Sequence, residues 1–363
     1  MKGKERVLCA LRRRRPDHVP VLPQIWLDHA ARISGIDPLS IMEHPELGFR
    51  AMLITAHHYG LDGFRTFLIY EPRRVVREGS MVYEVDPKTG EKMGLVDLEG
   101  GWGVKPFKPP NYVQDLDDVA RIPVPSAQSY WDDGRCVHLR QVVQEAGENH
   151  LVVGTALRFT TNWLLTQRGD KGLFDLYDQP RLVHALFEKG LQIAIEMTRA
   201  MRAAGVELFM MGDASASCDV ISPRHFREFA LPYYKSYCAE VRRLGALTYV
   251  HICGNQTPLA EMLADSGVDC IEPMDPAGGV DPADMKRRVG HRVALMGGVS
   301  TLTLLRGTPQ EVEEEARKCI LKAGRDGGYI LAAGCMVPRD TPEDNIRALV
   351  NTAHEFGRYP LPA

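Results

Sequence analysis

The sequence predicts that residues 1–363 form a single (β/α)8 barrel, and three observations favour this fold class. Apolar, β-rich runs bounded by turn residues recur eight times, segments with helical periodicity lie between most of them, and polar residues collect where the runs end. The runs are continuously apolar rather than alternating, which is typical of strands buried on both faces of a parallel sheet. Strands and helices in alternation favour an α/β barrel, which commonly occurs as one domain of this length.

The expected strands lie at intervals along the whole chain. In chain order they cover residues 19–25, 63–69, 150–157, 207–212, 247–253, 269–274, 293–298 and 328–334.

Three of the intervening helices have recognisable ends. Ser222 is an N-cap residue followed by proline, and the helix that it begins is expected to end at Gly245. Thr308 is also followed by proline and begins a helix that ends at Gly324, with acidic residues in the first turns that suit the helix dipole. Residues 340–357, after the last expected strand, again have a threonine followed by proline at the start of a helix and a glycine at its end.

Residues 70–149 interrupt the alternation between the second and third expected strands. Residues 82–97 (VYEVDPKTGEKMGLVD) predict a hairpin, and residues 105–125 are proline-rich and predict irregular chain. The apolar content of this interval is small for a domain that folds alone. We therefore interpret residues 70–149 as an insertion that covers the mouth of the barrel.

The composition argues against several classes of partner. A formal net charge of -3 gives no long-range field that would attract nucleic acid or an anionic membrane. No apolar run approaches the roughly 20 residues that span a bilayer, and the amino-terminal residues lack the apolar core of a signal peptide, so a cytoplasmic protein is expected. The eight cysteines lack the spacing of a disulfide scaffold, so most are expected to be buried thiols and one or two to be ligands.

Polar residues lie where a barrel carries its chemistry, at the carboxyl ends of the strands. His251 and Cys253 close the fifth expected strand and point the same way, because residues two apart in a strand share a face. Cys335 follows the eighth strand, three strands further around a closed ring with strands about 4.8 Å apart, and so faces them nearly across the mouth. One imidazole and two thiolates form a zinc-like ligand set with a fourth position open to water or substrate. The alternative is that each cysteine only packs in the interior.

Carboxylates and methionines lie at the same strand ends. Asp213 and Glu272 are candidates for catalytic groups that support or complete the metal site, or else for buried structural hydrogen bonds. Met274, Met296 and Met336 either fill gaps in the core or form part of an apolar surface for a broad ring lying over the barrel.

Four segments of the chain resemble a known family. They are GDASASCDVISPRHFREFALPYYK (residues 212–235), HICGN (251–255), GGVSTLTLLRGTPQEVEEEARKCI (297–320) and GGYILAAGCMVPRDTPEDNIRALV (327–350). The chain resembles the uroporphyrinogen decarboxylase superfamily, and within it the zinc-dependent cobamide methyltransferases, whose motif is H-x-C-G-N with a distant cysteine before a D-T-P-x-x-N helix. The match extends over nearly the whole chain, is diffuse between residues 70 and 150, and is more specific after residue 205.

The resemblance implies a zinc ion held by His251, Cys253 and Cys335 and a methyl group moved to or from the cobalt of cobalamin. True decarboxylases carry an M-R-Q-A-G-R stretch where this chain has IWLDHAARISG (residues 25–35), and a histidine where it has Cys335. The chain lacks a D-x-H-x-x-G cobamide-binding motif, so the corrinoid is expected on a partner protein or free. In this setting the three methionines would contact the corrinoid.

The second substrate is a small methylated compound or a thiol. The divergence of residues 64–110 from the coenzyme M enzymes favours a donor such as a methoxylated aromatic. Two alternatives stay open. One is a decarboxylase-type lyase with no metal, which would need Asp62 or Asp213 near a tetrapyrrole. The other is a non-catalytic corrinoid- or tetrapyrrole-binding protein.

Overall fold

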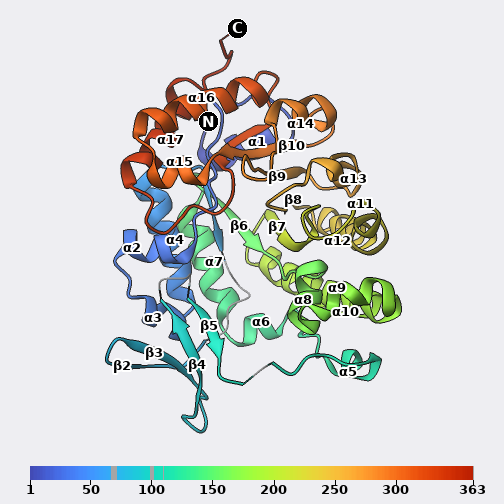
Figure 1. The fold of residues 1–363 in the computed structure, drawn as a ribbon. Helices are drawn as coiled ribbons and strands as arrows, with labels where there is room; N and C mark the ends of the chain where they lie inside the picture. The colour runs from blue at the N-terminus through green and yellow to red at the C-terminus, as the bar shows by residue number, and fades with distance from the viewer. Residues whose placement is uncertain (67–71, 99–101, 109, 363) are drawn as a thin grey trace.

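The structure is a computed structural model, which describes residues 1–66, 72–98, 102–108 and 110–362. Seven parallel strands form one sheet in the order β1-β6-β7-β8-β9-β10-β11, and helices lie around its outside, as in a TIM-barrel-like fold (Figure 1). The strands are β1 (Gly63–Thr66), β6 (Leu151–Thr155), β7 (Leu208–Gly212), β8 (Leu247–His251), β9 (Cys270–Met274), β10 (Ala294–Val299) and β11 (Tyr329–Ala333).

The two edges of this sheet are joined by the first expected strand, residues 19–25. The N–H of Leu22 donates to the carbonyl of Leu331 in β11 (3.1 Å), and the N–H of Asp62 donates to the carbonyl of Val21 (3.0 Å) just before β1. The prediction of a full strand here was wrong, because only Val21 forms a ladder pair, with Leu331. Prolines on both sides of this short stretch have no N–H to donate, which limits the ladder.

The other seven expected strands are confirmed, with shifts of a few residues at their ends. The second begins at Gly63 as predicted and is described as far as Thr66, and residues 67–69 of its predicted range lie outside the described residues.

The interior of the barrel is a packed core. Inward-facing residues of the strands form one buried apolar cluster, to which α1 (Gly3–Leu11) adds Val7, Ala10 and Leu11. α1 contacts β1, β6 and β11 and so fills the amino-terminal end of the barrel. A second, larger cluster lies between the outer face of the sheet and the surrounding helices. The carboxyl ends of the strands are left as the end where side chains can form a site.

Helices connect consecutive strands of the barrel from β6 onward. The predicted caps at Ser222 and Thr308 are confirmed, since their side chains accept hydrogen bonds from the N–H groups of His225 and Glu311. After α1 the α-helices are α2 (Leu27–Ser34), α3 (Pro38–Glu43), α4 (Glu46–Tyr59), α5 (Leu116–Arg121), α6 (Ser129–Asp132), α7 (Arg135–Ala146), α8 (Thr161–Arg168), α9 (Lys171–Asp178), α10 (Pro180–Ala203), α11 (Pro223–His225), α12 (Leu231–Arg243), α13 (Ala260–Asp265), α14 (Pro282–Val289), α15 (Thr301–Arg306), α16 (Pro309–Ala323) and α17 (Glu343–Glu355). A π-helical segment, Phe226–Ala230, joins α11 to α12, and short 3-10 turns are formed by Ala214–Ala216 and Thr257–Leu259.

A separate antiparallel sheet lies between β1 and β6 in the chain. Its strands are β2 (Val75–Glu78), β3 (Met81–Val85), β4 (Lys92–Asp97) and β5 (Gly103–Pro106), in sequence order. The predicted hairpin of residues 82–97 is confirmed by the pairing of β3 with β4. Figure 1 shows this small sheet at the side of the molecule away from α16, next to α3. α7, near the end of the predicted insertion, packs on α4 and β6 as part of the outer helical layer, and the covering role of residues 70–149 stays a prediction.

No helix in the described part of the chain has the length and apolar character needed to cross a membrane.

We expect Asp62→Ala to lower the free energy of unfolding by about 2–4 kcal/mol, because the carboxylate joins three parts of the fold. Asp62 is 3% exposed, accepts a hydrogen bond from the N–H of Val21 (2.7 Å) and forms an ion pair with Arg6 of α1. Asp326→Ala is the control, since its pair with Arg15 is exposed and should contribute less than about 1 kcal/mol. Denaturant unfolding measures both, and equal losses would contradict the special role of Asp62.

Candidate metal centre

The structure brings the three predicted metal ligands together at the carboxyl ends of the strands. His251 is the last residue of β8, Cys253 follows it by two positions, and Cys335 follows β11 by two. One ligand atom from each residue lies within 4.8 Å of the other two, and Nε2 of His251 is 3.9 Å from Sγ of Cys335. Residues separated by more than eighty positions therefore meet at one point.

The donor atoms fit a tetrahedral zinc ion. Bond lengths of about 2.0–2.1 Å to nitrogen and 2.3 Å to sulfur place tetrahedral ligand atoms roughly 3.5–3.8 Å apart. The distances within the triad reach 4.8 Å at most, so small side-chain movements suffice for all three to bind one ion. Three protein ligands leave the fourth position for water or substrate, as in catalytic rather than structural zinc sites.

Glu272 of β9 orients the imidazole of His251. Its Oε2 accepts a hydrogen bond from Nδ1 of His251 at 2.5 Å, which leaves Nε2 directed at the two sulfur atoms. The two residues are partners in the β8–β9 register, so their side chains lie on the same side of the sheet. Burial disfavours the charged imidazole, but the carboxylate of Glu272 outweighs it and raises the pKa of His251 to about 9. A carboxylate behind a histidine ligand of this kind fixes both its tautomer and its orientation.

The two thiols of the triad differ in acidity. A hydrogen bond between them stabilises the thiolate of Cys253 and lowers its pKa, although burial acts in the opposite direction. The same hydrogen bond, together with burial, raises the pKa of Cys335. Because the thiolate is the form that binds a metal, Cys253 is the sulfur ligand that is more readily available when the site is empty of metal.

Two carboxylates that the sequence reasoning missed hold the loop that carries Cys253. Asp275 accepts a hydrogen bond from the N–H of Gly254 (3.0 Å), and Asp219 accepts one from the N–H of Asn255 (2.8 Å). Gly254 has a φ of +84°, and a side chain there would lie 2.4 Å from Oδ2 of Asp219. The glycine of the H-x-C-G-N segment is thus required by backbone conformation and by close packing. In the sequence, the DVISP segment (residues 219–223) was the feature that could have pointed to Asp219.

Asp213, predicted as a catalytic carboxylate, has its side chain engaged in structural contacts. It accepts hydrogen bonds from the N–H groups of Thr161 (3.2 Å) and Asn162 (2.7 Å), and from the hydroxyls of Thr160 and Tyr234. Burial raises the pKa of Asp213, and these hydrogen bonds offset part of the effect. The contacts tie the start of α8 to the end of β7, and a catalytic role for Asp213 stays a prediction.

The three methionines predicted to contact a corrinoid occupy different environments. Met296 belongs to the interior cluster and Met274 to the outer core, and both are fully buried. Met336, beside Cys335, is 41% exposed. Contact with a cofactor stays a prediction for all three, and Met336 is the one whose surface is accessible as the protein stands.

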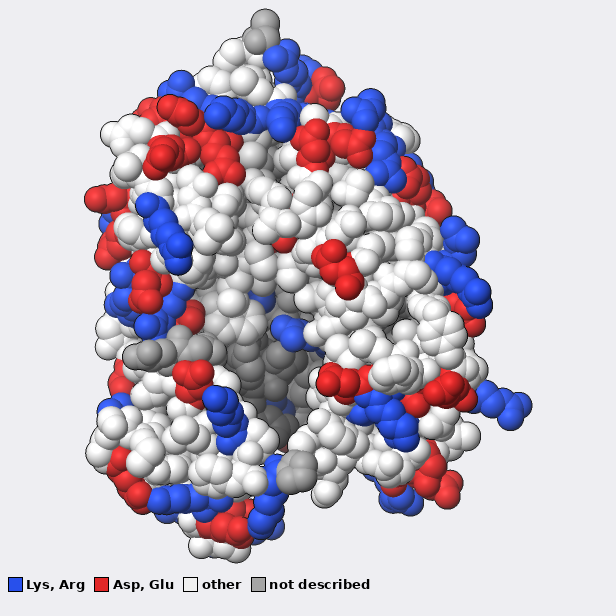
Figure 2. Space-filling model, in the orientation of Figure 1, with Lys and Arg blue, Asp and Glu red and all other residues white. Residues whose placement is uncertain are grey.

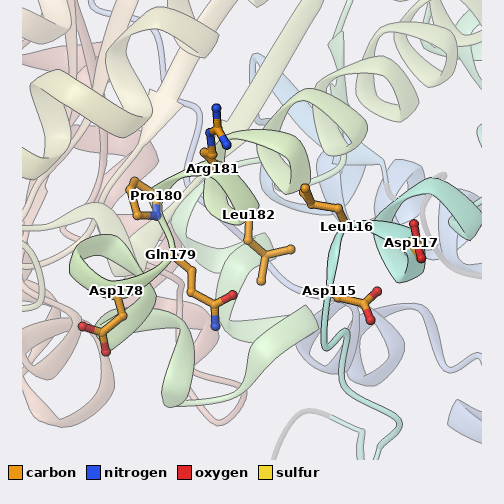
Figure 3. Close-up of a pocket in the computed structure, with 8 residues that line it drawn as sticks. All are labelled: Asp115, Leu116, Asp117, Asp178, Gln179, Pro180, Arg181 and Leu182. Carbon is orange, nitrogen blue, oxygen red and sulfur yellow. The ribbon is translucent and has the colours of Figure 1, made fainter.

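A surface pocket lies apart from the triad (Figure 3). Its lining comes from the start of α5 and from the junction of α9 with α10. The lining residues are Asp115, Leu116, Asp117, Asp178, Gln179, Pro180, Arg181 and Leu182. None of the predicted site residues lies in this pocket.

We expect Gly254→Ala to reduce zinc affinity more than tenfold, because a side chain at this position would displace Asp219 and with it the loop that carries Cys253. Gly279→Ala is the matched control: Gly279 also has a positive φ (+71°), but nothing lies within 4 Å of the new methyl group. Both variants carry the cost of the left-handed conformation, about 1–2 kcal/mol. Competition with a chromophoric chelator measures the affinity, and equal zinc binding by the two variants would count against the steric explanation.

We expect Glu272→Gln to weaken zinc binding by about 10- to 100-fold, because the neutral amide orients and polarises His251 less well than the carboxylate. Glu261→Gln is the control, since Glu261 lies on α13 and pairs with Arg288. The same chelator assay applies, and unchanged affinity in the Glu272 variant would show that the hydrogen bond has no role in the site.

Comparison with known proteins gives one family and several relatives. Residues 90–356 match the family described as uroporphyrinogen decarboxylase (URO-D). Methylcobamide:CoM methyltransferase MtaA of Methanosarcina barkeri is 35% identical over 176 residues, 47% of this chain and 49% of that protein. Methylated-thiol–coenzyme M methyltransferase of Methanosarcina mazei is 28% identical over 180 residues, 48% of this chain and 45% of that protein. The chain therefore spans about half the length of these two curated relatives.

Two further comparisons cover nearly the whole chain. Uroporphyrinogen decarboxylase of Anaeromyxobacter dehalogenans is 26% identical over 373 residues, 97% of this chain and 99% of that protein. Among solved structures, a methyltransferase from Methanosarcina mazei aligns with a TM-score of 0.79 and 23% identity over 98% of this chain and 99% of that chain, which shows a shared fold. Since the family match spans more than half of the sequence, the chain belongs to the uroporphyrinogen decarboxylase family.

Proposed function

We propose that the protein is a zinc-dependent corrinoid methyltransferase. It moves a methyl group between a small methylated substrate, or a thiol, and the cobalt of a corrinoid. The observation that carries this proposal is the convergence of His251, Cys253 and Cys335 at the strand ends. Three protein ligands would leave one position of a tetrahedral zinc ion for substrate.

The ligand set suits methyl transfer in either direction. A bound zinc ion supplies Lewis acidity that stabilises a thiolate or an alkoxide at neutral pH. The task of the protein is to hold that charge at a fixed place: Glu272 sets the orientation of His251, and Asp219 and Asp275 set the loop of Cys253. The sulfur of a thiol acceptor, or the oxygen of a methyl ether donor, would take the fourth ligand position of the zinc ion.

The relatives support the methyltransferase branch of the family. The names of two of them state methyl transfer to coenzyme M, and each matches about half of its own length. A methoxylated aromatic as methyl donor is our preferred substrate, because residues 64–110 diverge from the coenzyme M enzymes. The corrinoid would arrive on a partner protein or free, and residues 70–149 and Met336 would form part of the surface that receives it.

A lyase of the decarboxylase type is the second candidate, and the whole-chain similarity to a uroporphyrinogen decarboxylase favours it. Two observations count against it. Asp62 precedes β1 at the amino-terminal end of the barrel, opposite the triad, and pairs with Arg6. Asp213 already accepts four hydrogen bonds from the protein.

We expect Cys335→Ala to lower zinc affinity more than tenfold and methyl transfer by at least about a hundredfold, because a tetrahedral site loses one of its three protein ligands. Metal analysis of the purified protein gives the zinc content, and the absorbance change of cob(I)alamin with candidate methyl donors gives the transfer. Cys9→Ala, on α1 at the opposite end of the barrel, is the control and should retain both properties. Full zinc binding by the Cys335 variant would remove this residue from the site, and zinc-free wild-type protein would favour the lyase.

A further inference from the structure

Arg158 lies in the segment between β6 and α8, close to the strand end that carries His251. A methyl group on Gly212 would lie 3.7 Å from Nε of Arg158 and 3.0 Å from Cε of Met210. Gly212 is the register partner of His251 in the pairing of β7 with β8. Nε of Arg158 is therefore next to a backbone position that lies one strand spacing, about 4.8 Å, from the backbone of His251, the candidate metal ligand.

Arg158 and His251 lie on the same side of the sheet. Met210 belongs to the interior cluster of the barrel, so the side of Gly212 that meets Met210 and Arg158 faces the interior. Register partners on neighbouring parallel strands point the same way, and His251 therefore projects to this side as well. Because Gly212 has no side chain, the end of Met210 and the guanidinium group of Arg158 can both approach this part of β7.

The charge of Arg158 has no partner within the described part of the chain. Its side chain is exposed and makes no hydrogen bond or ion pair with any described residue. In contrast, Arg168, the last residue of α8, is buried and paired with Asp175 at 2.6 Å. Figure 2 shows the face of the molecule hollowed between the small sheet and the helices opposite it, with Lys and Arg atoms lining part of the hollow.

A second polar group, three residues before Arg158 in the chain, also has no partner among the described residues. Thr155, the last residue of β6, is buried, and its hydroxyl has no hydrogen-bond partner among the described residues. Val153, two positions earlier, faces the interior, so Thr155 faces the same way in the layer nearest the mouth. An unpartnered buried hydroxyl is uncommon in a native structure and indicates a ligand or water at this point.

The charges of the proposed site favour a cation here. With a divalent ion bound, two thiolates would balance its charge, and the carboxylate of Glu272 would leave an excess negative charge that repels an anionic substrate. A guanidinium group beside the centre offsets this repulsion and can bind a carboxylate or sulfonate through two parallel hydrogen bonds.

We propose that Arg158 is a specificity-determining residue that binds an anionic group on the small substrate, with Thr155 as an additional donor. This inference rests on the proposed function and adds the substrate class: a methylated acid or an acidic thiol rather than a neutral compound. The shared chemistry is a carboxylate or sulfonate a few ångströms from the reacting atom.

Calorimetric titration of the holoprotein, with no corrinoid present, tests the inference. The probes are 4-methoxybenzoate against 4-methoxybenzyl alcohol, and 2-mercaptoethanesulfonate against 2-mercaptoethanol. Arg158→Gln should weaken the binding of the anionic member of at least one pair by about 10- to 100-fold and leave its neutral member within about twofold. The pair that responds identifies a carboxylate or a sulfonate as the natural group.

Two further variants serve as references in the same titrations. Arg158→Lys keeps the charge and should restore part of the affinity, and Arg181→Gln, in the surface pocket of Figure 3, should change nothing. Equal weakening of anionic and neutral probes, or wild-type protein that binds neither anion at millimolar concentration, would overturn the inference. The zinc content of Arg158→Gln should equal that of the wild type, which separates loss of an anion contact from loss of the site.

The outcome is independent of whether methyl transfer occurs. Arg158-dependent binding of an anion with no methylation of cobalt would leave this inference standing and remove the proposed function. Methyl transfer that proceeds equally from neutral and anionic donors would leave the proposed function standing and remove this inference. If both hold, Arg158→Gln should raise KM for anionic substrates about 10- to 100-fold and change kcat little, as expected for an interaction equal in the ground and transition states.

Discussion

The closure of the parallel sheet by residues 19–22 is the constraint on which the rest of the structure depends. This segment hydrogen-bonds to Leu331 on one side and to Asp62 on the other, and so joins the last strand to the first. In a flat sheet of the same strand order, β8 and β11 would stand three strand spacings apart, about 14 Å. The donor atoms that follow these strands lie within 4.8 Å of one another, which requires the curvature that closure imposes.

Carboxylates around the candidate metal centre mainly fix positions. Glu272 orients the imidazole of His251, whereas Asp219 and Asp275 hold the N–H groups of the loop that follows it. Asp213 likewise holds the start of α8 by accepting hydrogen bonds from its N–H groups. The support of the candidate ligands therefore comes from carboxylates that accept hydrogen bonds, of which Glu272 and Asp275 are buried and Asp219 is exposed. This division explains how a small ligand set from distant parts of the chain can be kept in one geometry.

Much of the fold and of the site could be predicted from the sequence, because local patterns carry that information. Continuous apolar runs identify buried parallel strands, and the placement of His251, Cys253 and Cys335 at their ends predicts that these side chains meet at one candidate site once a barrel is assumed. The family resemblance rests on those same segments. The first strand was overestimated because its apolar character is genuine while its prolines prevent a ladder.

The sequence by itself determined the chemical type of the site: which side chains could bind a metal and at which end of the barrel they lie. Only the tertiary structure decided which polar groups act together. It placed Arg158 beside Gly212, used Asp213 as an anchor, and buried Met274 and Met296 while leaving Met336 accessible. The reason is that strand periodicity fixes the face on which a side chain lies, whereas its neighbours across the barrel depend on curvature, register and loop path, which involve residues far apart in the chain.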